Sequence, residues 1–263
     1  MAEPYPIRFE DGADYERLMG AWSRLAGAAF LDWVAPPPGL VWLDVGCGSG
    51  AFTELLLERA RAASVVGVDP SSGQLDHARR HLAGRAASFH EGDAMALPVA
   101  DAAFGAAAMA LVIFFVPEPT RGVAEMARAV RPGGLVASYA WDISGGGFPH
   151  EAMRETMRAL GMPVVMPPSV DAADLDALIG LWGGAGLVDI ETRVITVEQR
   201  FDDAAAYWQA TRAGPGARPP GPPPTPEQMV ALREGAVARL ARDAAGRIIV
   251  SARAHAVRGR VPQ

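Results

Sequence analysis

Short apolar runs alternate with amphipathic stretches between residues 40 and 140 of the chain. Apolar runs of this length are typical of buried strands, whereas apolar positions that recur every three or four residues indicate helices. We expect strands at 40–45, 64–69, 87–90, 103–112 and 135–140. We expect the intervening helices at 51–62, 72–83 and 120–130. Strands that alternate with helices predict a doubly wound α/β fold around a parallel sheet.

An amphipathic stretch precedes the first strand. Apolar residues recur at three- and four-residue steps from Asp14 to Val34, which predicts a pair of helices packed on the core. A second interpretation is that this segment covers a ligand site and contributes Trp22 or Arg24 to it. Residues 1–12 are polar and are expected to be loosely docked.

The alternation becomes less regular after Trp141. We expect further helices at 149–160, 171–182, 201–211 and 227–242, and further strands at 187–197 and 247–256. The last strand is expected at the sheet edge, beside the strand 187–197. A flexible joint at 145–147 and a stiff, proline-rich connector at 214–226 complete the prediction.

Composition narrows the class of protein. With 263 residues, half of them hydrophobic, one large domain with a sizeable core is expected. The formal net charge of −6 argues against nucleic acid as the main partner. Cys47 is the only cysteine, which excludes an intrachain disulfide and a cysteine-based metal cluster. No signal-peptide core and no apolar run of membrane-spanning length are present, so we expect a cytoplasmic protein.

The candidate chemistry centres on the glycine loop, LDVGCGSG, at Leu43–Gly50. Gly46, Gly48 and Gly50 stand where a strand turns at once into a helix. Glycine tolerates the backbone angles of such a turn and lets a ligand lie directly on the backbone. The helix that follows offers free N–H groups to that ligand. The loop therefore predicts a nucleotide-like ligand at a strand end.

Two ligand classes fit the glycines, because Gly46–Ala51 also satisfies the dinucleotide fingerprint. Asp69 ends the second strand about 20 residues later and can accept hydrogen bonds from both ribose hydroxyls. Asp44 suits a ligand with an ammonium group better than a pyrophosphate, because like charges repel. Asp93 and Ala94 can meet an adenine amine and ring nitrogen. An NAD(P)-dependent oxidoreductase stays as the less favoured alternative, since all 24 basic residues are arginine and a Tyr-x-x-x-Lys group cannot form.

Four motifs in order, LDVGCGSG, VGVDPS, GDAMALPVADAAF and RPGG, resemble those of class I S-adenosylmethionine-dependent methyltransferases. The resemblance covers residues 12–142 and is greatest to the small-molecule branch that includes the ubiquinone and menaquinone biosynthesis methyltransferases. It implies a Rossmann-like, seven-stranded sheet, mostly parallel with the last strand antiparallel, with N-terminal helices and a helical lid. One domain, 1–263, would then comprise an N-terminal cover (1–39), a cofactor-binding core (40–142), a lid (143–186) and C-terminal strands and helices (187–263).

The resemblance also implies S-adenosylmethionine as cofactor and methyl transfer to a small-molecule acceptor. Asp44 and Gly46 would lie near the methionine portion, Asp69 at the ribose, and Leu111 near the sulfonium. The residues expected around the cofactor are Asp44, Gly46, Cys47, Gly48, Asp69, Pro70, Gln74, Asp93, Ala94, Leu111, Trp22 and Arg24. We expect no nucleic-acid partner and no membrane span, and a homodimer stays open.

The catalytic base is the least defined feature of the sequence. The stretch Leu111–Val116 is wholly apolar, where related sequences often carry a polar residue, and this favours an apolar or aromatic acceptor. Phe114 or Phe115 could face the sulfonium or belong to the core. Individually weak candidates for a base are His150, Asp142 and Tyr139.

No metal is expected, because His77 and His81 have no third ligand in view. Adaptable apolar groups mark the expected lid and support an apolar acceptor: Met153, Met157, Met162, Met166 and Trp182. A protein that binds the cofactor on the same fold without methylating is a further alternative.

Overall fold

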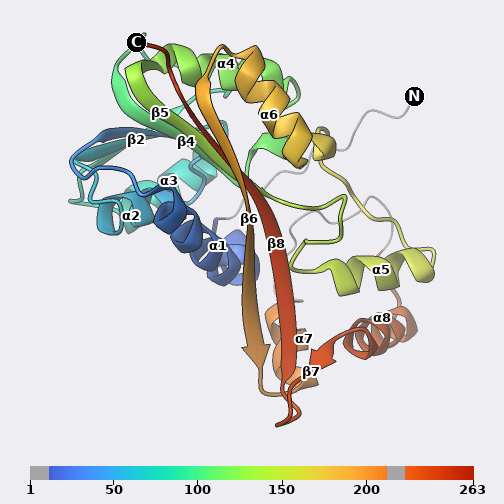
Figure 1. The fold of residues 1–263 in the computed structure, drawn as a ribbon. Coiled ribbons are helices and arrows are strands. Elements are labelled where there is room, and N and C mark those ends of the chain that lie inside the picture. Colours follow the sequence, from blue (N-terminus) through green and yellow to red (C-terminus); the bar gives the residue numbers. More distant parts are fainter. Residues whose placement is uncertain (1–11, 212–222) are drawn as a thin grey trace.

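A single twisted sheet forms the centre of the computed structural model, which describes residues 12–211 and 223–263 (Figure 1). Its strand order is β3-β2-β1-β4-β5-β8-β6, with β7 paired to β8. The strands from β1 to β5 pair in parallel, whereas β8 runs antiparallel between β5 and β6. The strands are β1 (Val41–Val45), β2 (Ser64–Asp69), β3 (Ala87–Glu91), β4 (Phe104–Ala110), β5 (Val130–Trp141), β6 (Val188–Phe201), β7 (Ala241–Arg242) and β8 (Ile248–Arg260).

Helices cover both faces of this sheet, with α1, α2 and α3 on one face and α4 and α6 on the other (Figure 1). The α-helices are α1 (Gly12–Val34), α2 (Ala51–Glu58), α3 (Ser72–His81), α4 (Pro119–Ala129), α5 (Glu151–Ala159), α6 (Leu175–Gly184), α7 (Ala204–Thr211) and α8 (Pro226–Ala238). Two 3-10 helices, η1 (Ile113–Phe115) and η2 (Val170–Ala173), lie beside each other. The doubly wound α/β fold predicted from the alternation is confirmed.

The small residues of β4 explain why it occupies the middle of the sheet. β4 lies between β1 and β5, and all of its residues except Ala110 are buried. A strand covered on both faces must be apolar throughout, and the run Gly105–Ala108 leaves room for large side chains such as Trp42 next to it. The carboxyl ends of β1, β2 and β4 consequently meet at one end of the sheet.

The sheet has eight strands in the described residues rather than the seven expected. The expected helix 227–242 ends at Ala238, and Ala241–Arg242 pairs with β8 instead. The expected edge position of the last strand was also wrong, because β8 lies between β5 and β6. Its buried residues alternate with more exposed ones along most of its length, as in a strand with one face more deeply buried than the other. Arg131–Gly134, which lies before the expected strand 135–140, forms part of β5.

One continuous helix, α1, replaces the expected pair of N-terminal helices. No proline lies between Gly12 and Ala35, and Gly27 allows close packing on the core. A Cβ atom on Gly27 would stand 2.7 Å from Leu55 Cδ1 of α2. Our predictions for residues 1–11, and for 214–222 of the proline-rich connector, lie outside the described residues.

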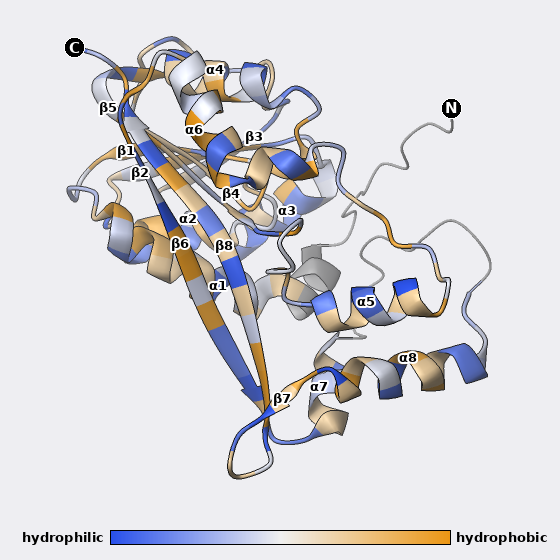
Figure 2. Cartoon of the chain, turned by 45° about the vertical axis from the view of Figure 1, so that its right-hand side comes forward, coloured by the Kyte–Doolittle hydropathy of each residue, from blue (hydrophilic) through white to orange (hydrophobic). Residues whose placement is uncertain are grey.

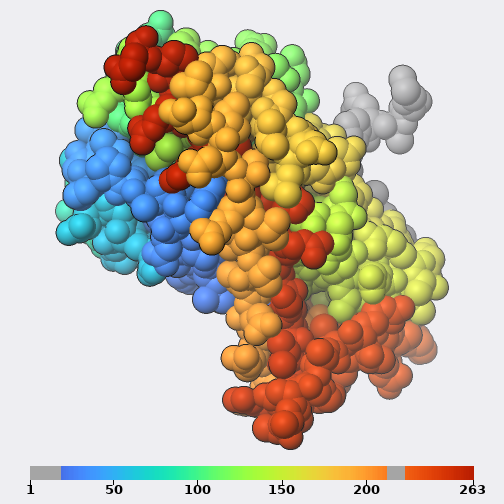
Figure 3. Space-filling model, in the orientation of Figure 1, coloured from blue at the N-terminus to red at the C-terminus, as the bar shows by residue number. Residues whose placement is uncertain are grey.

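The strands β6 and β8 continue well beyond the rest of the sheet (Figures 1 and 3). Pairing of β8 with β5 ends at Ala254, whereas 248–252 pairs with 197–201 of β6, and Ile248 and Ile249 also pair with β7. Figure 2 shows apolar and polar residues alternating along this pair. Helix α5 packs against α8 beside it. We call these parts the arm: 197–201, 248–252, α5, α7, α8 and β7. Among the described helices, none combines the length and apolar composition needed to cross a bilayer.

Candidate active site

The glycine loop lies at the carboxyl end of β1 and adopts backbone angles that require glycine. Gly46, Gly48 and Gly50 have φ of +73°, +50° and +87°. A Cβ atom on Gly46 would stand 2.5 Å from a methyl group of Val112, which packs over the loop. The N–H of Gly46 donates to the carbonyl of Val68 at 2.7 Å, which ties the loop to β2. The loop is therefore fixed at the carboxyl ends of β1 and β2. Its glycines have no side chains that would keep a ligand away from the backbone.

Asp44, just before the loop, is fully buried. Its Oδ2 accepts a hydrogen bond from Thr53 Oγ1 at 2.6 Å, and its Oδ1 has no donor among the described residues. Burial raises the pKa of this carboxyl to about 7, and the nearby charge of Asp69 adds to the rise. Thr53 was not among the residues expected at the site. Its position in the first turn of the helix after the glycines is the feature of the sequence that could have indicated it. The arrangement leaves a buried acceptor that a cationic donor would satisfy.

Asp69, the last residue of β2, contacts the glycine loop directly. Its carboxylate accepts the N–H of Gly48 and the N–H of Ser71, each at 2.9 Å. Burial raises the pKa of Asp69, and these two N–H groups oppose the rise. Ser71 also caps α3 by accepting the N–H of Gln74. Pro70, which lies between Asp69 and Ser71, is exposed. The predicted pairing of glycine loop and acid is thus present in the structure.

Two further residues expected at the cofactor lie beside the loop. Gln74 is buried, and its Oε1, which has no donor in the described part of the chain, is 3.9 Å from where a Cβ on Gly48 would be. Cys47 is also buried, and burial raises the pKa of its thiol well above the usual value. A neutral thiol is a poor nucleophile, so Cys47 contributes small size rather than reactivity.

The expected adenine loop begins next to Asp69. The N–H of Gly92 donates to the Asp69 carbonyl at 3.2 Å, and Asp93 follows at the surface. Asp93 Oδ1 accepts the N–H of Met95 at 2.8 Å, and Ala94 between them is half-buried. The turn keeps the Asp93 carboxylate at the same end of the sheet as the glycine loop.

Leu111 follows β4 in a left-handed conformation, with φ of +61°. Such a conformation is strained for leucine and often marks a functional position. Its side chain is buried, and its N–H donates to the carbonyl of Tyr139 at 2.7 Å. Beyond it, Phe114 is buried and meets the half-buried Phe115 edge-on at 4.6 Å. Of the two aromatic residues, Phe115 is therefore the more available to a ligand.

The residues expected from α1 fall in different surroundings. Trp22 is buried in the main hydrophobic core, whereas Arg24 is exposed. Tyr139 is buried as well, with its ring 4.7 Å from that of Phe30 and 5.8 Å from that of Phe52. The roles of Trp22 and Arg24 at the cofactor, and of Tyr139 as a base, stay predictions.

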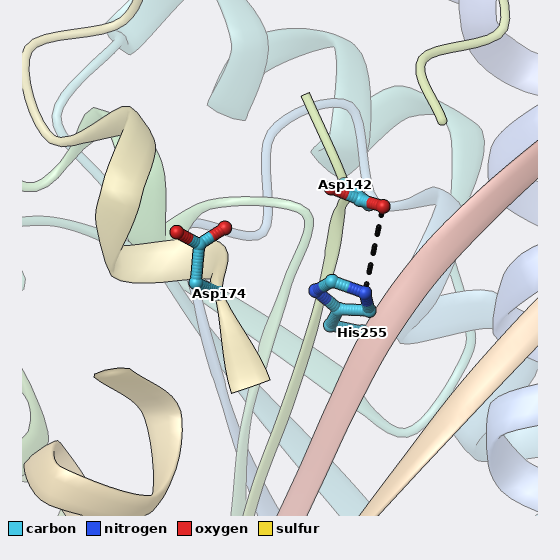
Figure 4. Close-up of side chains that lie close together, drawn as sticks. All are labelled: Asp142, Asp174 and His255. Carbon is cyan, nitrogen blue, oxygen red and sulfur yellow. Dashed lines mark ion pairs between the residues drawn. The ribbon is translucent and has the colours of Figure 1, made fainter. Parts of the chain in front are cut away.

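Asp142 belongs to an ion-pair network at the carboxyl end of β5. Its Oδ2 accepts from Nε and Nη2 of Arg253 at 2.7 and 2.6 Å, and its Oδ1 accepts the N–H of Gly145. His255 Nε2 is 3.5 Å from the same carboxylate, and Asp174 lies nearby (Figure 4). These three residues could offer ligands to a metal, but Arg253 already compensates the charge of Asp142. The surroundings favour Asp142 as an anchor between β5 and β8 rather than as a base.

The remaining candidates lie in the segment expected to form a lid. His150 is buried, with its ring edge-on to Phe148 at 5.6 Å. Trp182 packs on the sheet, where its indole N–H donates to the carbonyl of Val136 at 3.0 Å. Helix α6 thus covers the sheet, and Trp182 is removed from the set of candidate acceptor contacts. Met153 is half-buried against the core, and Met166 is exposed.

Known proteins match the first half of the chain most strongly. A family model described as a methyltransferase domain matches residues 43–138. An uncharacterized methyltransferase of Mycobacterium leprae is 35% identical over 135 residues, 51% of this chain and 48% of the relative. A demethylmenaquinone methyltransferase of Deinococcus radiodurans is 41% identical over 115 residues, 43% of this chain and 46% of the relative. The chain thus spans about half the length of these curated relatives.

Solved structures match the fold over most of the chain. YcgJ of Bacillus subtilis has a TM-score of 0.60 and 14% identity, over 90% of this chain and 98% of its own. The phosphoethanolamine N-methyltransferase 2 of Haemonchus contortus, in complex with S-adenosyl-L-methionine, has a TM-score of 0.60 and 17% identity, over 96% of this chain and 57% of its own. The [4+2]-cyclase SpnF has a TM-score of 0.52 and 19% identity, over 99% of this chain and 88% of its own.

At these identities the solved structures establish the fold alone. The family model covers the residues that form the glycine loop, Asp69 and the expected adenine loop. Residues 43–138 therefore match the methyltransferase-domain family, and the chain as a whole has the fold of the solved methyltransferases.

Proposed function

We propose that this protein transfers the methyl group of S-adenosylmethionine to a small-molecule acceptor. The observation that carries the proposal is the cluster formed by the glycine loop, the buried Asp44 and Asp69 at the carboxyl ends of β1 and β2. Ligands of doubly wound folds bind at this end of the sheet.

The residues at the loop fit this cofactor. Asp44 Oδ1 and Gln74 Oε1 are buried acceptors that no donor among the described residues satisfies. A ligand with ammonium and hydroxyl donors would complement them, whereas a pyrophosphate would be repelled by Asp44. We assign Asp44 to the methionine portion, Asp69 and Gln74 to the ribose, and Asp93 with Ala94 to the adenine.

When bound, the cofactor would supply a methyl group on a cationic sulfur, so transfer neutralises charge and needs little electrophilic help. The protein's task is then to align the acceptor and exclude water. The buried Leu111 and the aromatic Phe115 provide apolar surface at the end of β4 for this purpose.

We infer an apolar or aromatic acceptor from the absence of a polar side chain in Leu111–Val116. The demethylmenaquinone methyltransferase among the relatives is consistent with a quinone-like ring. The same apolar stretch, and the fold shared with the cyclase SpnF, keep a second candidate: a protein that binds the cofactor without methylating.

The first test is a thermal-shift panel with S-adenosylmethionine, S-adenosylhomocysteine, NAD and NADP. We expect a rise in Tm with the first two only, because a ligand stabilises the state that binds it. A rise with NAD or NADP alone would overturn the assignment. Incubation with methyl-labelled cofactor and a panel of phenols and reduced quinones then separates the candidates, since only a methyltransferase yields a product heavier by one labelled methyl group.

The variant Asp69→Ala tests the ribose assignment. It should weaken cofactor affinity by about 2–4 kcal/mol, because two charge-assisted hydrogen bonds are lost. Asp76→Ala is the matched control, since Asp76 is an exposed acid of α3 paired with Arg79. Calorimetric titration checks both, and equal affinity in the two variants would show that Asp69 does not hold the cofactor.

A further inference from the structure

A pocket lies at the opposite end of the sheet from the glycine loop. Its volume is about 670 Å³, and it is lined by the amino ends of β4, β5 and β6, the end of β8 and the turn between α1 and β1. Gln263 at the end of the sequence also lines it. The five residues of β1 separate the two sites by about 16 Å. This pocket is therefore distinct from the proposed cofactor site.

Three arginines and two acidic residues line this pocket. The charge of Arg258 is already compensated, because its Nη2 donates to both carboxylate oxygens of Glu191 at 2.8 and 2.9 Å. Its Nη1 donates to the carbonyl of Val34 at 3.0 Å, which caps the end of α1. Arg258 and Glu191 thus form part of the wall.

The other two arginines have no acidic partner in the described part of the chain. Arg260 donates from Nη1 to the carbonyl of Gly133 at 2.9 Å and makes no ion pair. Arg131 makes neither an ion pair nor a hydrogen bond there, and its Nη2 lies 3.1 Å from where a Cβ on Gly105 would be. Asp189, the remaining acid, pairs with neither arginine. The side chains of the lining thus carry three positive and two negative charges, in a protein whose formal net charge is −6.

Apolar residues and glycines make up most of the rest of the lining, which also includes Gln263. The apolar side chains of the lining come from α1, from the turn after it, and from strands or positions next to strands. They include Val34, Pro36, Pro37, Leu40, Leu135 and Ile190. A volume of this size is typical of sites for small molecules. The pocket therefore combines a preformed apolar wall with two guanidinium groups.

We propose that this pocket binds a small organic anion, a carboxylate or phosphate carried on an apolar body. Guanidinium groups recognise both anions through paired N–H donors, and Arg131 and Arg260 keep donors available for them. The apolar wall would hold the body of the ligand. The acidic protein as a whole disfavours a long polyanion, so the occupant is a small molecule. This site is additional to the proposed methyl transfer and does not depend on it.

Calorimetric titration with phenyl phosphate, benzoate and inorganic phosphate tests the proposal. All titrations contain saturating S-adenosylhomocysteine. This ligand occupies the proposed cofactor site, so the measured heat does not come from a probe that binds there. We expect saturable binding of phenyl phosphate or benzoate, and at least tenfold weaker binding of inorganic phosphate, which lacks the apolar body. The stronger of the two aromatic probes identifies the anionic group. No saturable binding of either aromatic probe in the presence of S-adenosylhomocysteine would overturn the proposal.

The double variant Arg131→Gln/Arg260→Gln should bind the aromatic probes at least tenfold more weakly. Arg80→Gln/Arg200→Gln is the matched control, because it removes two exposed arginines on α3 and β6 outside the pocket. An unchanged Tm of both variants shows that the fold is kept. Equal affinities in the two double variants would mean that the pocket arginines do not bind the anion; if the pocket pair unfolds, each single variant replaces it.

Discussion

At the scale of a single residue, Asp44 has the most unusual environment in the proposed cofactor site. Its carboxyl group is fully buried, with one oxygen bonded to Thr53 and the other without a donor among the described residues. Burial raises its pKa to about 7, so the ligand-free protein carries it largely protonated at mildly acidic pH. An ammonium group beside it would favour the ionised form and lower that pKa again.

This linkage predicts the pH dependence of cofactor affinity. Below pH 7 the carboxyl must lose its proton before it can pair with the ammonium group, so binding releases a proton. The Kd for S-adenosylmethionine should rise about tenfold per unit as the pH falls from about 7 to 5, and approach a plateau near 7. Calorimetric titration across this range measures the profile.

The variant Asp44→Asn provides the control, because its amide does not titrate. Its affinity should be lower than that of the native protein at pH 7 and nearly constant from pH 5 to 7. A native profile as flat as that of the variant would contradict the assignment of Asp44 to the ammonium group.

At the scale of elements, the glycine loop packs closely against the stretch that follows β4, and the contact is between Gly46 and Val112. Gly46 has φ of +73°, and Val112 occupies the space that a side chain there would need. Gly46→Ala should lower the free energy of unfolding by about 2–5 kcal/mol, from backbone strain of about 1–2 kcal/mol and overpacking of about 1–3 kcal/mol. Urea unfolding measures the loss.

Two companion variants separate these costs. Gly39→Ala has a similar φ of +81° but open space, so it should lose only the strain. Val112→Ala should recover the overpacking when it is added to Gly46→Ala, which appears as a favourable coupling energy in a double-mutant cycle. Equal losses for Gly46→Ala and Gly39→Ala would rule out the close approach.

Elements defined by local pattern could be predicted from the sequence. The bounds of β2 agree with the prediction, because Val65, Val66 and Val68 form a short β-branched run between turn signals. The start of the next helix at Ser72 agrees with the prediction for an equally local reason, because Ser71 caps it. The glycine loop and Asp69 were placed together because consecutive parallel strands end on the same side of the sheet.

Features that depend on distant partners could not be predicted in this way. The length of β6 and β8 in the arm follows from their pairing with each other, which no local run specifies. The burial of Trp182 on the sheet follows from the placement of α6. Asp142 was a candidate base because it follows a strand, but its surroundings are set by Arg253, 111 residues further along the chain.

At the scale of the whole molecule, the sheet divides the protein into three functional regions. The proposed cofactor site lies at the carboxyl ends of the parallel strands, and the arginine-lined pocket lies at their amino ends. The arm extends β6 and β8 beyond β5. The junction between the arm and the core is the network around Asp142, where Arg253 also donates to the carbonyl of Gly145.

This junction should control the stability of the arm. Arg253→Ala leaves the buried carboxylate of Asp142 without its main partner, and breaking such a pair costs about 3–5 kcal/mol. We expect the lower end, about 3 kcal/mol, because Arg253 is itself 43% exposed and His255 stays nearby. Urea unfolding measures the total, and amide hydrogen exchange should quicken in 248–252 while the glycine loop stays protected.

Two controls distinguish a buried charge from a simple loss of contacts. Arg200→Ala breaks an exposed pair with Glu198 and should cost less than about 1 kcal/mol. Adding Asp142→Asn to Arg253→Ala removes the unpaired charge and should restore part of the stability, even though a further hydrogen-bonding group has changed. If Arg253→Ala cost no more than Arg200→Ala, the arm would be held by its strand pairing and helix packing alone, and the network would have no structural role.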